Sequence, residues 1–556
     1  MKFKFKILIL FCILLLTGTA VKAQSNTVGL IYNDSAKSYN GYTLFSPLAS
    51  TNSYLIDNRG YLIHEWTSQY RPAQSVMLLP DGSLLRPAII QSGNIFLAGG
   101  AGGRVERYDW DGNLIWSFDY YSSEHCTHHD IAYLPNGDIL MIAWENKTYA
   151  EAIAAGRNPA RLDTALWPGE IIEVKPTGTS GGDIVWQWHA WDHLIQDYDS
   201  TKANYGDVPK HPELIDINYG STIEDWLHIN SVRYNPQRDE ILLSVHNFSE
   251  IWVIDHSTTT AEAAGHSGGR EGKGGDLLYR WGNPQAYRAG TAADQMLFSQ
   301  HDARWIDSGL VGQGDILIFN NDHGAPPNAY STVDEITPPL NSNGEYYLDS
   351  TGQYEPNSLT WRYETIPPTS FYAKNISGEE RLPNGNTLIC EGTAGKFFEV
   401  DNLGNIVWEY INPVTRNGIL TQGDTPSFNL VFKIYRYSPE YSGLAGKDLS
   451  EKGKIELYPT AIKNGNSSPA RFSLEQNFPN PFNPSTVIHY EIPNGAFVTL
   501  KVFDVLGKEV KTLINKFQNK GKYVIDFNAS KLTSGIYFYS LHSGNYISTK
   551  KMILLR

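Results

Sequence analysis

The sequence Leu79-Pro80-Asp81-Gly82-Ser83-Leu84-Leu85 recurs almost unchanged as LPNGDIL at residues 134–140 and as LPNGNTL at residues 382–388. Weaker copies occur at residues 235–243 and 312–318. Proline followed by Asx-Gly between apolar runs is typical of a tight turn between two strands, because glycine supplies the positive φ that such a turn needs. The repeat therefore predicts a fold built from several similar antiparallel β-units.

A second repeated feature is a pair of aromatic residues, two positions apart, at the end of a strand. Since side chains alternate along a strand with a period of two, both rings of a pair lie on one face and can pack against the next sheet. Six such pairs predict a six-bladed β-propeller, whose ring the stretch Tyr42–Phe45 is expected to help close. The alternatives are an array of β-sandwiches or a β-helix, although a β-helix requires shorter and more uniform repeats. The pairs are His64/Trp66, Trp116/Phe118, Trp186/Trp188, Tyr279/Trp281, Trp361/Tyr363 and Trp408/Tyr410.

Charge and the first residues narrow the class of protein. The 556-residue chain has a formal net charge of -14, so we expect no nucleic-acid partner. Residues 1–23 have the pattern of a secretory signal, in which lysines precede the apolar residues 7–16 and Val21-Lys22-Ala23 forms a small-x-small cleavage motif. The apolar run is short for a membrane anchor, and no later segment reaches transmembrane length. We therefore expect a secreted mature chain without a membrane span.

The rest of the chain divides into three segments. We predict the propeller over residues 24–440 and a linker, rich in Gly, Ser, Asn and Lys, over residues 441–468. A small β-sandwich domain is predicted over residues 469–556, with strands marked by apolar runs such as residues 487–490 and 499–503. The predicted fold class is therefore all-β, with two domains of different size.

The final segment contains LEQNFPNPFNP at residues 474–484, FDVLGKEV at 503–510 and GIY at 535–537. These motifs resemble the type A sorting domain of the type IX secretion system of Bacteroidota-like bacteria. The resemblance implies the type IX machinery as a partner, export across the outer membrane, removal of the tail, and release or surface attachment of the product. The alternative is a carbohydrate-binding or generic immunoglobulin-like module.

Three histidines occupy related positions in three predicted blades. Alignment on the turns places His129 and His301 at one equivalent position, five residues before the apolar residue at the turn. His228 lies two residues earlier relative to its own turn, which keeps it on the same face of its strand. Because the innermost strand of every blade lines the central channel, these side chains are expected to meet near the axis, with His128 and His125 close by. We interpret them as a functional cluster.

A histidine cluster is suited to two kinds of chemistry. Imidazole can act as a nucleophile that holds a transferred group and later releases it. Neighbouring imidazoles then serve as acid and base near neutral pH. Three neutral imidazoles can equally bind Zn or Mn. The residues by themselves leave both interpretations open.

Residues 41–437 as a whole are similar to the arylsulfate sulfotransferases. The motifs that carry the similarity are GYTLF at 41–45, YLID at 54–57, HHD at 128–130 with LPNG at 134–137, DWLHINS at 225–231 and FSQHDA at 298–303. The resemblance implies a six-bladed propeller that uses an aryl sulfate donor and a phenolic acceptor. It also implies that no nucleotide, metal or other cofactor takes part.

The resemblance further implies a ping-pong reaction with a role for each histidine. His301 matches the nucleophile that carries a transient sulfohistidine. His228 and one histidine of the His128–His129 pair match residues that bind sulfate oxygens and assist proton transfer; the repeat alignment favours His129, with His128 as the alternative. His246 stands where the family usually has an arginine, and we expect it to bind substrate. Since histidine is only partly charged at pH 7, sulfate binding is expected to be weaker or more pH-dependent, or the substrate to differ.

Two other functions are compatible with the same residues. One is a metal-dependent polysaccharide lyase or hydrolase that uses the channel histidines as ligands. The other is a non-catalytic surface-binding propeller whose channel mouth holds a ligand. For His246, simple packing within its blade is the alternative to substrate binding.

Overall fold

The computed structural model divides the chain into two units, Met1–Pro459 and Thr460–Arg556. The signal predicted over residues 1–23 lies outside the described residues. Within the described part of the chain, no helix has the length and apolar character needed to cross a membrane. The described residues are 26–90, 95–324, 326–458, 471–477, 480–544 and 546–555.

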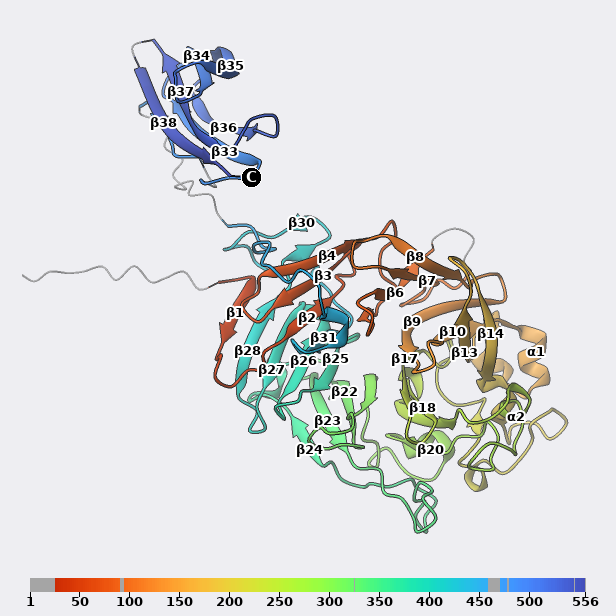
Figure 1. Cartoon of the computed structure of the whole chain (residues 1–556). Coiled ribbons are helices and arrows are strands. Elements are labelled where there is room, and N and C mark those ends of the chain that lie inside the picture. Colours follow the sequence, from red (N-terminus) through yellow and green to blue (C-terminus); the bar gives the residue numbers. More distant parts are fainter. Residues whose placement is uncertain are drawn as a thin grey trace, which may run out of the picture. The chain divides into compact units, whose positions relative to one another are not determined.

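The first unit is a six-bladed β-propeller, in which antiparallel sheets surround a common centre (Figure 1). From the innermost strand outward, blade 1 is β31 (Tyr435–Tyr437), β2 (Tyr42–Phe45), β3 (Asn52–Asp57) and β4 (Leu62–Thr67); blade 2 is β5 (Met77–Leu78), β6 (Leu84–Ile89), β7 (Gly103–Tyr108) and β8 (Leu114–Asp119); and blade 3 is β9 (His125–Tyr133), β10 (Ile139–Glu145), β13 (Gly169–Pro176) and β14 (Gly182–His189).

In the same order, blade 4 is β17 (Ile229–Asn235), β18 (Glu240–Val245), β19 (Glu250–Asp255) and β20 (Tyr279–Trp281); blade 5 is β21 (His301–Trp305), β22 (Ile316–His323), β23 (Tyr330–Ile336) and β24 (Trp361–Tyr363); and blade 6 is β25 (Gly378–Arg381), β26 (Thr387–Glu391), β27 (Lys396–Val400), β28 (Ile406–Ile411) and β1 (Gly29–Asn33). This arrangement confirms the predicted propeller.

The repeated Pro-Asx-Gly turns connect the first and second strands of blades 2, 3 and 6. Gly82, Gly137 and Gly385 have φ values of +84°, +93° and +88°. Each of these glycines donates its N–H to the carbonyl of the leucine three residues earlier, at 2.9 Å. Side chains with a Cβ rarely adopt this backbone region, which explains why the Asx-Gly pair recurs. The predicted turns are therefore confirmed.

The aromatic pairs lie on the fourth strand of each blade and contact the next blade. In five of the six pairs, an indole N–H donates to a backbone carbonyl just before the fourth strand of the following blade, at 2.7–3.0 Å. The bond from Trp408 Nε1 to Asn58 O (2.9 Å) joins blade 6 to blade 1. Each ring thus buries apolar area while its N–H keeps a hydrogen bond, so the pairs fix the spacing of the blades.

Strands from both ends of the unit complete the ring. Strand β2, which contains the stretch predicted to help close the ring, pairs with β31, so that Tyr42 faces Tyr437 and Leu44 faces Tyr435. Strand β1 adds to the outer edge of blade 6 by pairing with β28. Because two blades each contain strands from distant parts of the chain, the ring cannot open without breaking backbone hydrogen bonds.

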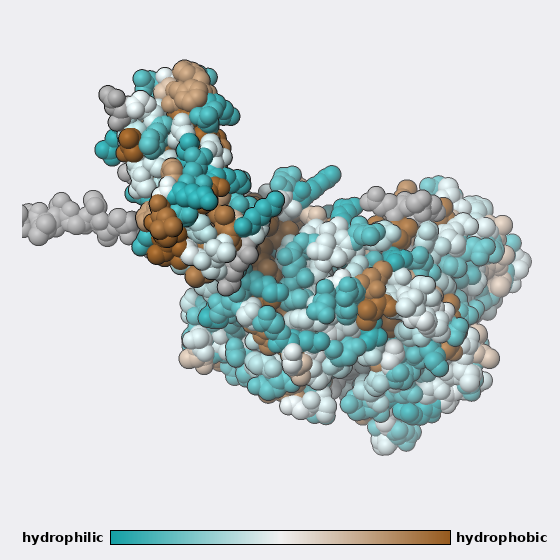
Figure 2. Space-filling model, turned by 45° about the horizontal axis from the view of Figure 1, so that its top comes forward, coloured by the Kyte–Doolittle hydropathy of each residue, from teal (hydrophilic) through white to brown (hydrophobic). Residues whose placement is uncertain are grey.

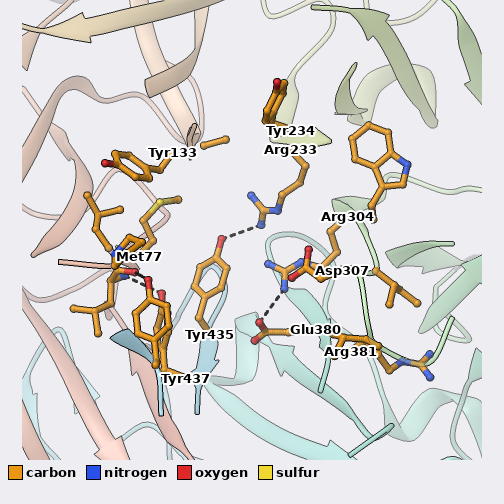
Figure 3. Close-up of a pocket in the computed structure, with 18 residues that line it drawn as sticks. Met77, Tyr133, Arg233, Tyr234, Arg304, Asp307, Glu380, Arg381, Tyr435 and Tyr437 are labelled. Carbon is orange, nitrogen blue, oxygen red and sulfur yellow. Dashed lines mark hydrogen bonds and ion pairs between the residues drawn. The ribbon is translucent and has the colours of Figure 1, made fainter. Parts of the chain in front are cut away.

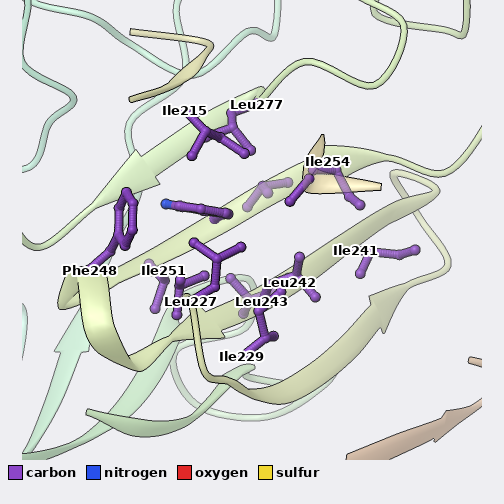
Figure 4. Close-up of a cluster of buried hydrophobic side chains, with 14 of the residues drawn as sticks. Ile215, Leu227, Ile229, Ile241, Leu242, Leu243, Phe248, Ile251, Ile254 and Leu277 are labelled. Atoms are coloured by element: carbon purple, nitrogen blue, oxygen red, sulfur yellow. The ribbon is translucent and has the colours of Figure 1, made fainter. Parts of the chain in front are cut away.

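Apolar side chains fill the space between the blades. Figure 4 shows part of this core in blade 4, where Leu243 and Ile251 pack with Leu227 and Ile229. The same segment carries His228, so the core holds that histidine on a rigid support. The face of the propeller that is turned to the viewer in Figure 2 is mainly hydrophilic, with small scattered hydrophobic patches.

Residues 441–458, predicted as part of the linker, pack on the propeller instead. The short helix η8 (Ser442–Leu444) places Leu444 in the apolar core of blades 1 and 2, where it is 2% exposed. Ile455 is 6% exposed and belongs to the core shared by blades 1 and 6. The prediction was wrong for this part because turn-rich composition also occurs in packed segments, where a few apolar side chains decide the outcome.

The second unit is a small β-sandwich, as predicted. In strand β33, buried residues alternate with exposed or half-buried ones, and Ile488 and Tyr490 point into the core. One sheet contains β32 (Ser473–Leu474), β33 (Ser485–Ile492) and β36 (Gly521–Asn528); the other contains β35 (Glu509–Gln518), β34 (Ala496–Phe503), β37 (Gly535–Ser543) and β38 (Tyr546–Leu554).

Loops between the propeller strands carry a few short elements. They are α1 (Tyr149–Ala154), α2 (Thr260–Ala263) and the two-stranded ladders β11 (Lys147–Thr148) with β12 (Ala165–Leu166), β15 (Leu194–Ile195) with β16 (Ile215–Asp216) and β29 (Val414–Thr415) with β30 (Gly418–Ile419). Both helices begin with a capping box, in which a threonine and a glutamate three residues later satisfy the first N–H groups.

Candidate active site

The five histidines predicted as site residues come together at one end of the central channel. His129 lies in β9, His228 directly precedes β17 and His301 begins β21, so three successive blades contribute. His128 precedes His129 in the same strand, and His246 begins the short helix η4 (His246–Phe248) that follows β18. The inner strands of neighbouring blades lie side by side, which brings together residues that are far apart in the sequence.

The imidazole rings form one continuous chain. Phe432 closes the group on the opposite side, with its ring centroid 6.1 Å from that of His129 and 6.4 Å from that of His301. The centroid distances along the chain are 5.1 Å for His128–His129, 4.6 Å for His129–His228, 5.1 Å for His228–His246 and 5.1 Å for His246–His301.

The two adjacent histidines of β9 have different surroundings. His129 lies between His228 and Phe432, among the other imidazoles. His128 stacks on Trp144 with a centroid distance of 3.8 Å and an interplanar angle of 14°. Their Nδ1 atoms are 2.8 Å apart, so one ring donates a hydrogen and the other accepts it. His129 therefore faces the other rings directly, and His128 supports it from behind.

A backbone irregularity directs three of the five histidines. His129 and His228 have φ values of +53° and +50°, and the strand register shifts beside both of them. At His301 the shift occurs with the next residue, Asp302, whose φ is +40°. A bulge of this kind interrupts the alternation of a strand and re-aims a side chain, at the cost of local strain. The strain is thus concentrated where the imidazoles meet.

A buried asparagine sets the tautomer of His301. Nδ1 of His301 lies 2.9 Å from Oδ1 of Asn321. The amide nitrogen of Asn321 donates to the carbonyls of Ala373 (2.8 Å) and Ile376 (2.9 Å), so its oxygen must be the acceptor. Nδ1 of His301 therefore carries the proton, and Nε2 keeps its lone pair.

The same logic applies to two neighbouring rings. Nδ1 of His228 donates to Oδ2 of Asp225 at 2.5 Å, and Oδ1 of Asp225 accepts from Nε1 of Trp144 at 2.8 Å. Nδ1 of His246 lies 2.8 Å from Oδ1 of Asn247. The amide nitrogen of Asn247 donates to the carbonyl of Asp225, which fixes that oxygen as an acceptor. In both rings Nε2 is the atom left for a ligand.

Burial favours neutral imidazoles in this cluster. Burial, and then the neighbouring rings, lower the pKa of His129 and His301 well below the ordinary value. The pKa of His246 falls to about 4 through burial and the nearby His228, and burial lowers that of His128 to about 3. Burial acts to raise the pKa of Asp225, but the attraction of His228 outweighs it and the pKa is lowered. At neutral pH the cluster thus combines neutral rings with one carboxylate-supported histidine.

Residues 32–432 of the chain match the family described as Arylsulfotransferase (ASST). The chain belongs to the arylsulfotransferase family. The match includes strands of all six blades and the five histidines, and it supports an enzyme of the sulfotransferase type. Residues 476–555 match the Secretion system C-terminal sorting domain family, which supports export to the cell surface by the type IX system. No curated protein matches the chain.

Several solved structures are distantly similar to this family member. A protein of unknown function from Bacteroides caccae is 13% identical with a TM-score of 0.38, over 72% of this chain and 99% of that one. Virginiamycin B lyase from Staphylococcus aureus is 10% identical with a TM-score of 0.27, over 61% of this chain and 70% of the lyase. Because these TM-scores are low, the fold is assigned from the strand pairing of this chain and not from its similarity to these structures.

A cluster of buried charged residues joins the strands that carry the histidines. Asp130 and Asp302 directly follow His129 and His301 in the sequence. Nζ of Lys433 contacts Asp130 at 2.6 Å and Asp302 at 3.2 Å. The guanidinium of Arg233 contacts both carboxylates at 3.0 Å. These ion pairs cross three blades and tie the segment before β31 to them.

A glycine-rich loop covers part of the cluster. The N–H of His129 donates to the carbonyl of Gly100 at 2.9 Å. Gly100 has a φ of +83°, and a Cβ at this position would collide with the His129 ring. A Cβ at the exposed Gly99 would lie 3.8 Å from Cε1 of His228. Only glycine therefore lets this loop approach the imidazoles so closely.

Sequence reasoning missed several residues that support the histidines. Asp225 and Asp302 lie within motifs that were recognised, next to the histidines in sequence, but nothing in the pattern assigned them a role. Asn321 occurs in an apolar strand, and a buried asparagine in such a strand is the one signal that was available. Phe432 and Lys433 follow no motif, and only the folded ring brings them to the site.

Two other groups of side chains have the geometry for a shared metal ion. They are His193, His266 and Asp276, and Glu145, Glu170 and His189. Within the described residues, neither group includes a channel histidine. In the first group, His193 and His266 each contact Asp276 at 2.8 Å, an arrangement that a hydrogen-bonded ion pair also explains.

Proposed function

We propose that this propeller transfers a sulfuryl group from an aryl sulfate ester to a phenolic acceptor, through a sulfohistidine at His301. The observation that carries the proposal is the hydrogen bond of 2.9 Å from Nδ1 of His301 to Asn321, which leaves Nε2 unprotonated. Burial lowers the pKa of His301 well below its ordinary value, so the ring is a neutral nucleophile at pH 7. The donor ester already contains the sulfuryl group, so the reaction requires no nucleotide.

The reaction divides into two half-reactions. In the first, Nε2 of His301 attacks sulfur, the N–S bond forms and the bond from sulfur to the aryl oxygen breaks. The phenolate leaves with the electron pair and takes a proton from Nε2 of His228, whose positive charge Asp225 stabilises at 2.5 Å. In the second, the now neutral His228 removes the proton of the acceptor phenol, whose oxygen attacks sulfur. The N–S bond breaks and its electron pair returns to His301.

The remaining histidines are proposed to bind the sulfate oxygens. His129 lies next to His228, and His246 lies between His228 and His301, with centroid distances of 4.6–5.1 Å. Because Nδ1 of His246 donates to Asn247, its neutral ring offers a lone pair at Nε2 and not a hydrogen. The ring can donate to a sulfate oxygen only after it gains a second proton. An arginine at this position would carry that charge permanently.

The sorting tail supports a reaction outside the cell. The family match over residues 476–555 supports the type IX machinery as the partner in export. We propose that the signal at residues 1–23 directs the chain to the periplasm, that the tail is removed after export, and that the product is released or held at the surface. Phenolic sulfates in the surroundings of the cell are then available as substrates.

The test is transfer from 4-nitrophenyl sulfate to added phenol by the purified full chain, without nucleotide and with a chelator present. We expect nitrophenol release that depends on the acceptor, and a sulfuryl group on the His301 peptide when the donor is added alone. His301→Ala should abolish both, whereas the exposed His211→Ala should change neither. Activity that requires a metal ion would instead favour a lyase or hydrolase, and intact protein without turnover would favour a binding propeller.

A further inference from the structure

A second concave site lies at the other end of the same six inner strands. Its cavity has a volume of about 380 Å³, within the range of about 300–1,000 Å³ that is typical of small-molecule sites. His228 directly precedes inner strand β17 and His301 begins inner strand β21, whereas residues at the carboxyl ends of these two strands, Arg233 and Trp305, line this cavity. Figure 3 shows the cavity with the residues that line it. Every inner strand contributes one or more of Met77, Tyr133, Arg233, Trp305, Arg381 and Tyr435.

Arg304 is a buried cation with unused hydrogen-bonding capacity in this cavity. It is 8% exposed, and within the described residues its Nε has no hydrogen-bond partner. Its contacts with carboxylates are long: Nε lies 3.9 Å from Asp302, and Nη1 lies 3.6 Å from Glu380. These distances exceed those of hydrogen bonds. A buried guanidinium in this state is stabilised by any anion that reaches it.

The other two guanidiniums of the cavity are already occupied. Arg233 contacts Asp130 and Asp302, both at 3.0 Å. Arg381 forms an ion pair with Glu335. Arg304 is therefore the group with which a ligand can form a new charge-assisted hydrogen bond.

Aromatic rings form the walls beside Arg304. The guanidinium carbon of Arg304 lies 5.0 Å from the centroid of the Tyr435 ring, and that of Arg233 lies 5.8 Å from the same centroid. Tyr437 and Tyr441 lie 4.8 Å apart, centroid to centroid, on the adjacent wall. Flat aromatic surfaces next to a cation suit a ligand that combines a planar ring with a negative group.

Arg304 attracts an anion into the cavity against the repulsion of two carboxylates, since the other two guanidiniums are already paired. Three guanidiniums and the two carboxylates of Asp307 and Glu380 line it. Glu380 accepts a hydrogen bond from the backbone N–H of Arg436 at 2.9 Å, so one of its carboxylate oxygens already has a partner. Asp307 is exposed and repels an anion only weakly through water.

We propose that this cavity binds a small aromatic anion, with the carboxylate, sulfonate or sulfate group on Arg304 and the ring against Tyr435. The site is separate from the histidines, and binding there requires no reaction. The Asp130–Arg233–Asp302–Lys433 cluster lies between the two ends of the channel, so the strands that hold the ligand also hold His129 and His301.

The test is isothermal titration of the full chain with naphthalene-1-sulfonate, whose C–S bond cannot be transferred. We expect saturable binding that persists in His301→Ala. Arg304→Gln should weaken it by at least about tenfold, since a hydrogen bond to a charged group is lost. Asp307→Asn should change the affinity little, because this exposed charge repels an anion only weakly through water. Arg362→Gln, which changes an arginine outside the cavity, should leave the affinity unchanged.

Leu310→Trp provides an independent test that keeps every charge. Leu310 lines the cavity from a loop, and a larger side chain there fills the space for the ligand. We expect binding to be lost while the thermal unfolding temperature stays close to that of the parent. The proposal is overturned if the parent shows no saturable binding, or if folded Arg304→Gln or Leu310→Trp binds as the parent does.

Discussion

Blades 2, 3, 4 and 6 each have a residue with positive φ at the equivalent position of the repeat. In blades 3 and 4 this residue is a histidine, whereas in blades 2 and 6 it is not. His129 and His228 have φ values of +53° and +50°, and the corresponding Gln74 and Ser377 have values of +96° and +92°. All four residues are therefore in the left-handed region, which is rare for residues other than glycine. In blade 6, Oγ of Ser377 only accepts a hydrogen bond from the N–H of Gly392. The repeat thus supplies a kinked channel mouth in several blades, and the side chain decides whether an imidazole joins the cluster.

The largest effect is expected from removing the proposed nucleophile in one blade, in comparison with removing the matching polar residue in another. We expect His301→Ala to lower kcat by about 10⁴-fold or more, because the covalent route is lost. Gln74→Ala, at the kinked position of blade 2, should lower kcat by less than about threefold, because the buried Oε1 of Gln74 has no hydrogen-bond partner among the described residues that the change would remove. Initial rates with 4-nitrophenyl sulfate measure both. Comparable losses in the two variants would contradict the division of roles between blades.

The next largest effect is expected where a carboxylate supports one histidine. Asp225→Asn keeps the acceptor for Trp144 but removes the charge that stabilises the protonated form of His228. We expect kcat to fall by about 10²–10³-fold, within the range for general acid–base catalysis. The loss should be greater for phenyl sulfate than for 4-nitrophenyl sulfate, because the poorer leaving group needs the proton more. An equal loss for both donors would assign Asp225 a purely structural role.

A smaller effect is expected from the loop that covers the cluster. Gly100→Ala places a methyl group against the His129 ring and forces a residue with a Cβ to adopt a φ of +83°. We expect a loss of about 1–3 kcal/mol in the free energy of unfolding from the strained backbone, together with a severalfold fall in kcat. Denaturant unfolding and initial rates measure the two quantities. Gly112→Ala, at a φ of +83° with no neighbour near its Cβ, is the matched control for strain without collision.

The smallest and most specific effect concerns the pH dependence of donor binding. The pKa of His246 is about 4, so the ring is neutral at pH 7 and becomes a cation only as the pH falls toward 4. An anionic donor favours the cation, so KM for the aryl sulfate should fall as the pH is lowered from 7 to 5. In His246→Arg the charge is permanent and KM should vary much less over this range. Identical profiles for the parent and the variant would show that His246 does not contact the sulfate.

Local patterns in the sequence predicted much of the architecture. The Asx-Gly turns, the packing of the aromatic pairs against the next blade and the closing stretch at Tyr42–Phe45 were all confirmed by the structure. They were predictable because each depends on residues only a few positions apart, such as a glycine with positive φ or two rings on one face of a strand. The linker was predicted too long because composition does not reveal that Leu444 and Ile455 are buried.

The candidate site was predictable only in part. The position of His129 and His301 relative to their turns, together with the family motifs, was enough to select the histidines. Asn321, which sets the proton on His301, gave no such signal, and neither did Lys433, which joins Asp130 and Asp302. Their partners lie on other strands or at the far end of the domain.

The sequence by itself determined that the chain is an all-β propeller with a sorting tail, and that histidines from three blades meet in its channel. Only the tertiary structure decided which imidazole nitrogen of His228, His246 and His301 is left for a ligand, and how buried ion pairs hold the inner strands together. It also decided that a cavity at the other end of the channel contains Arg304, whose Nε has no hydrogen-bond partner among the described residues. Turns and strand faces follow from short-range sterics and periodicity. Tautomers, ion pairs and cavities depend on hydrogen bonds and packing between residues that are distant in sequence. Such contacts produce no periodic pattern in the sequence.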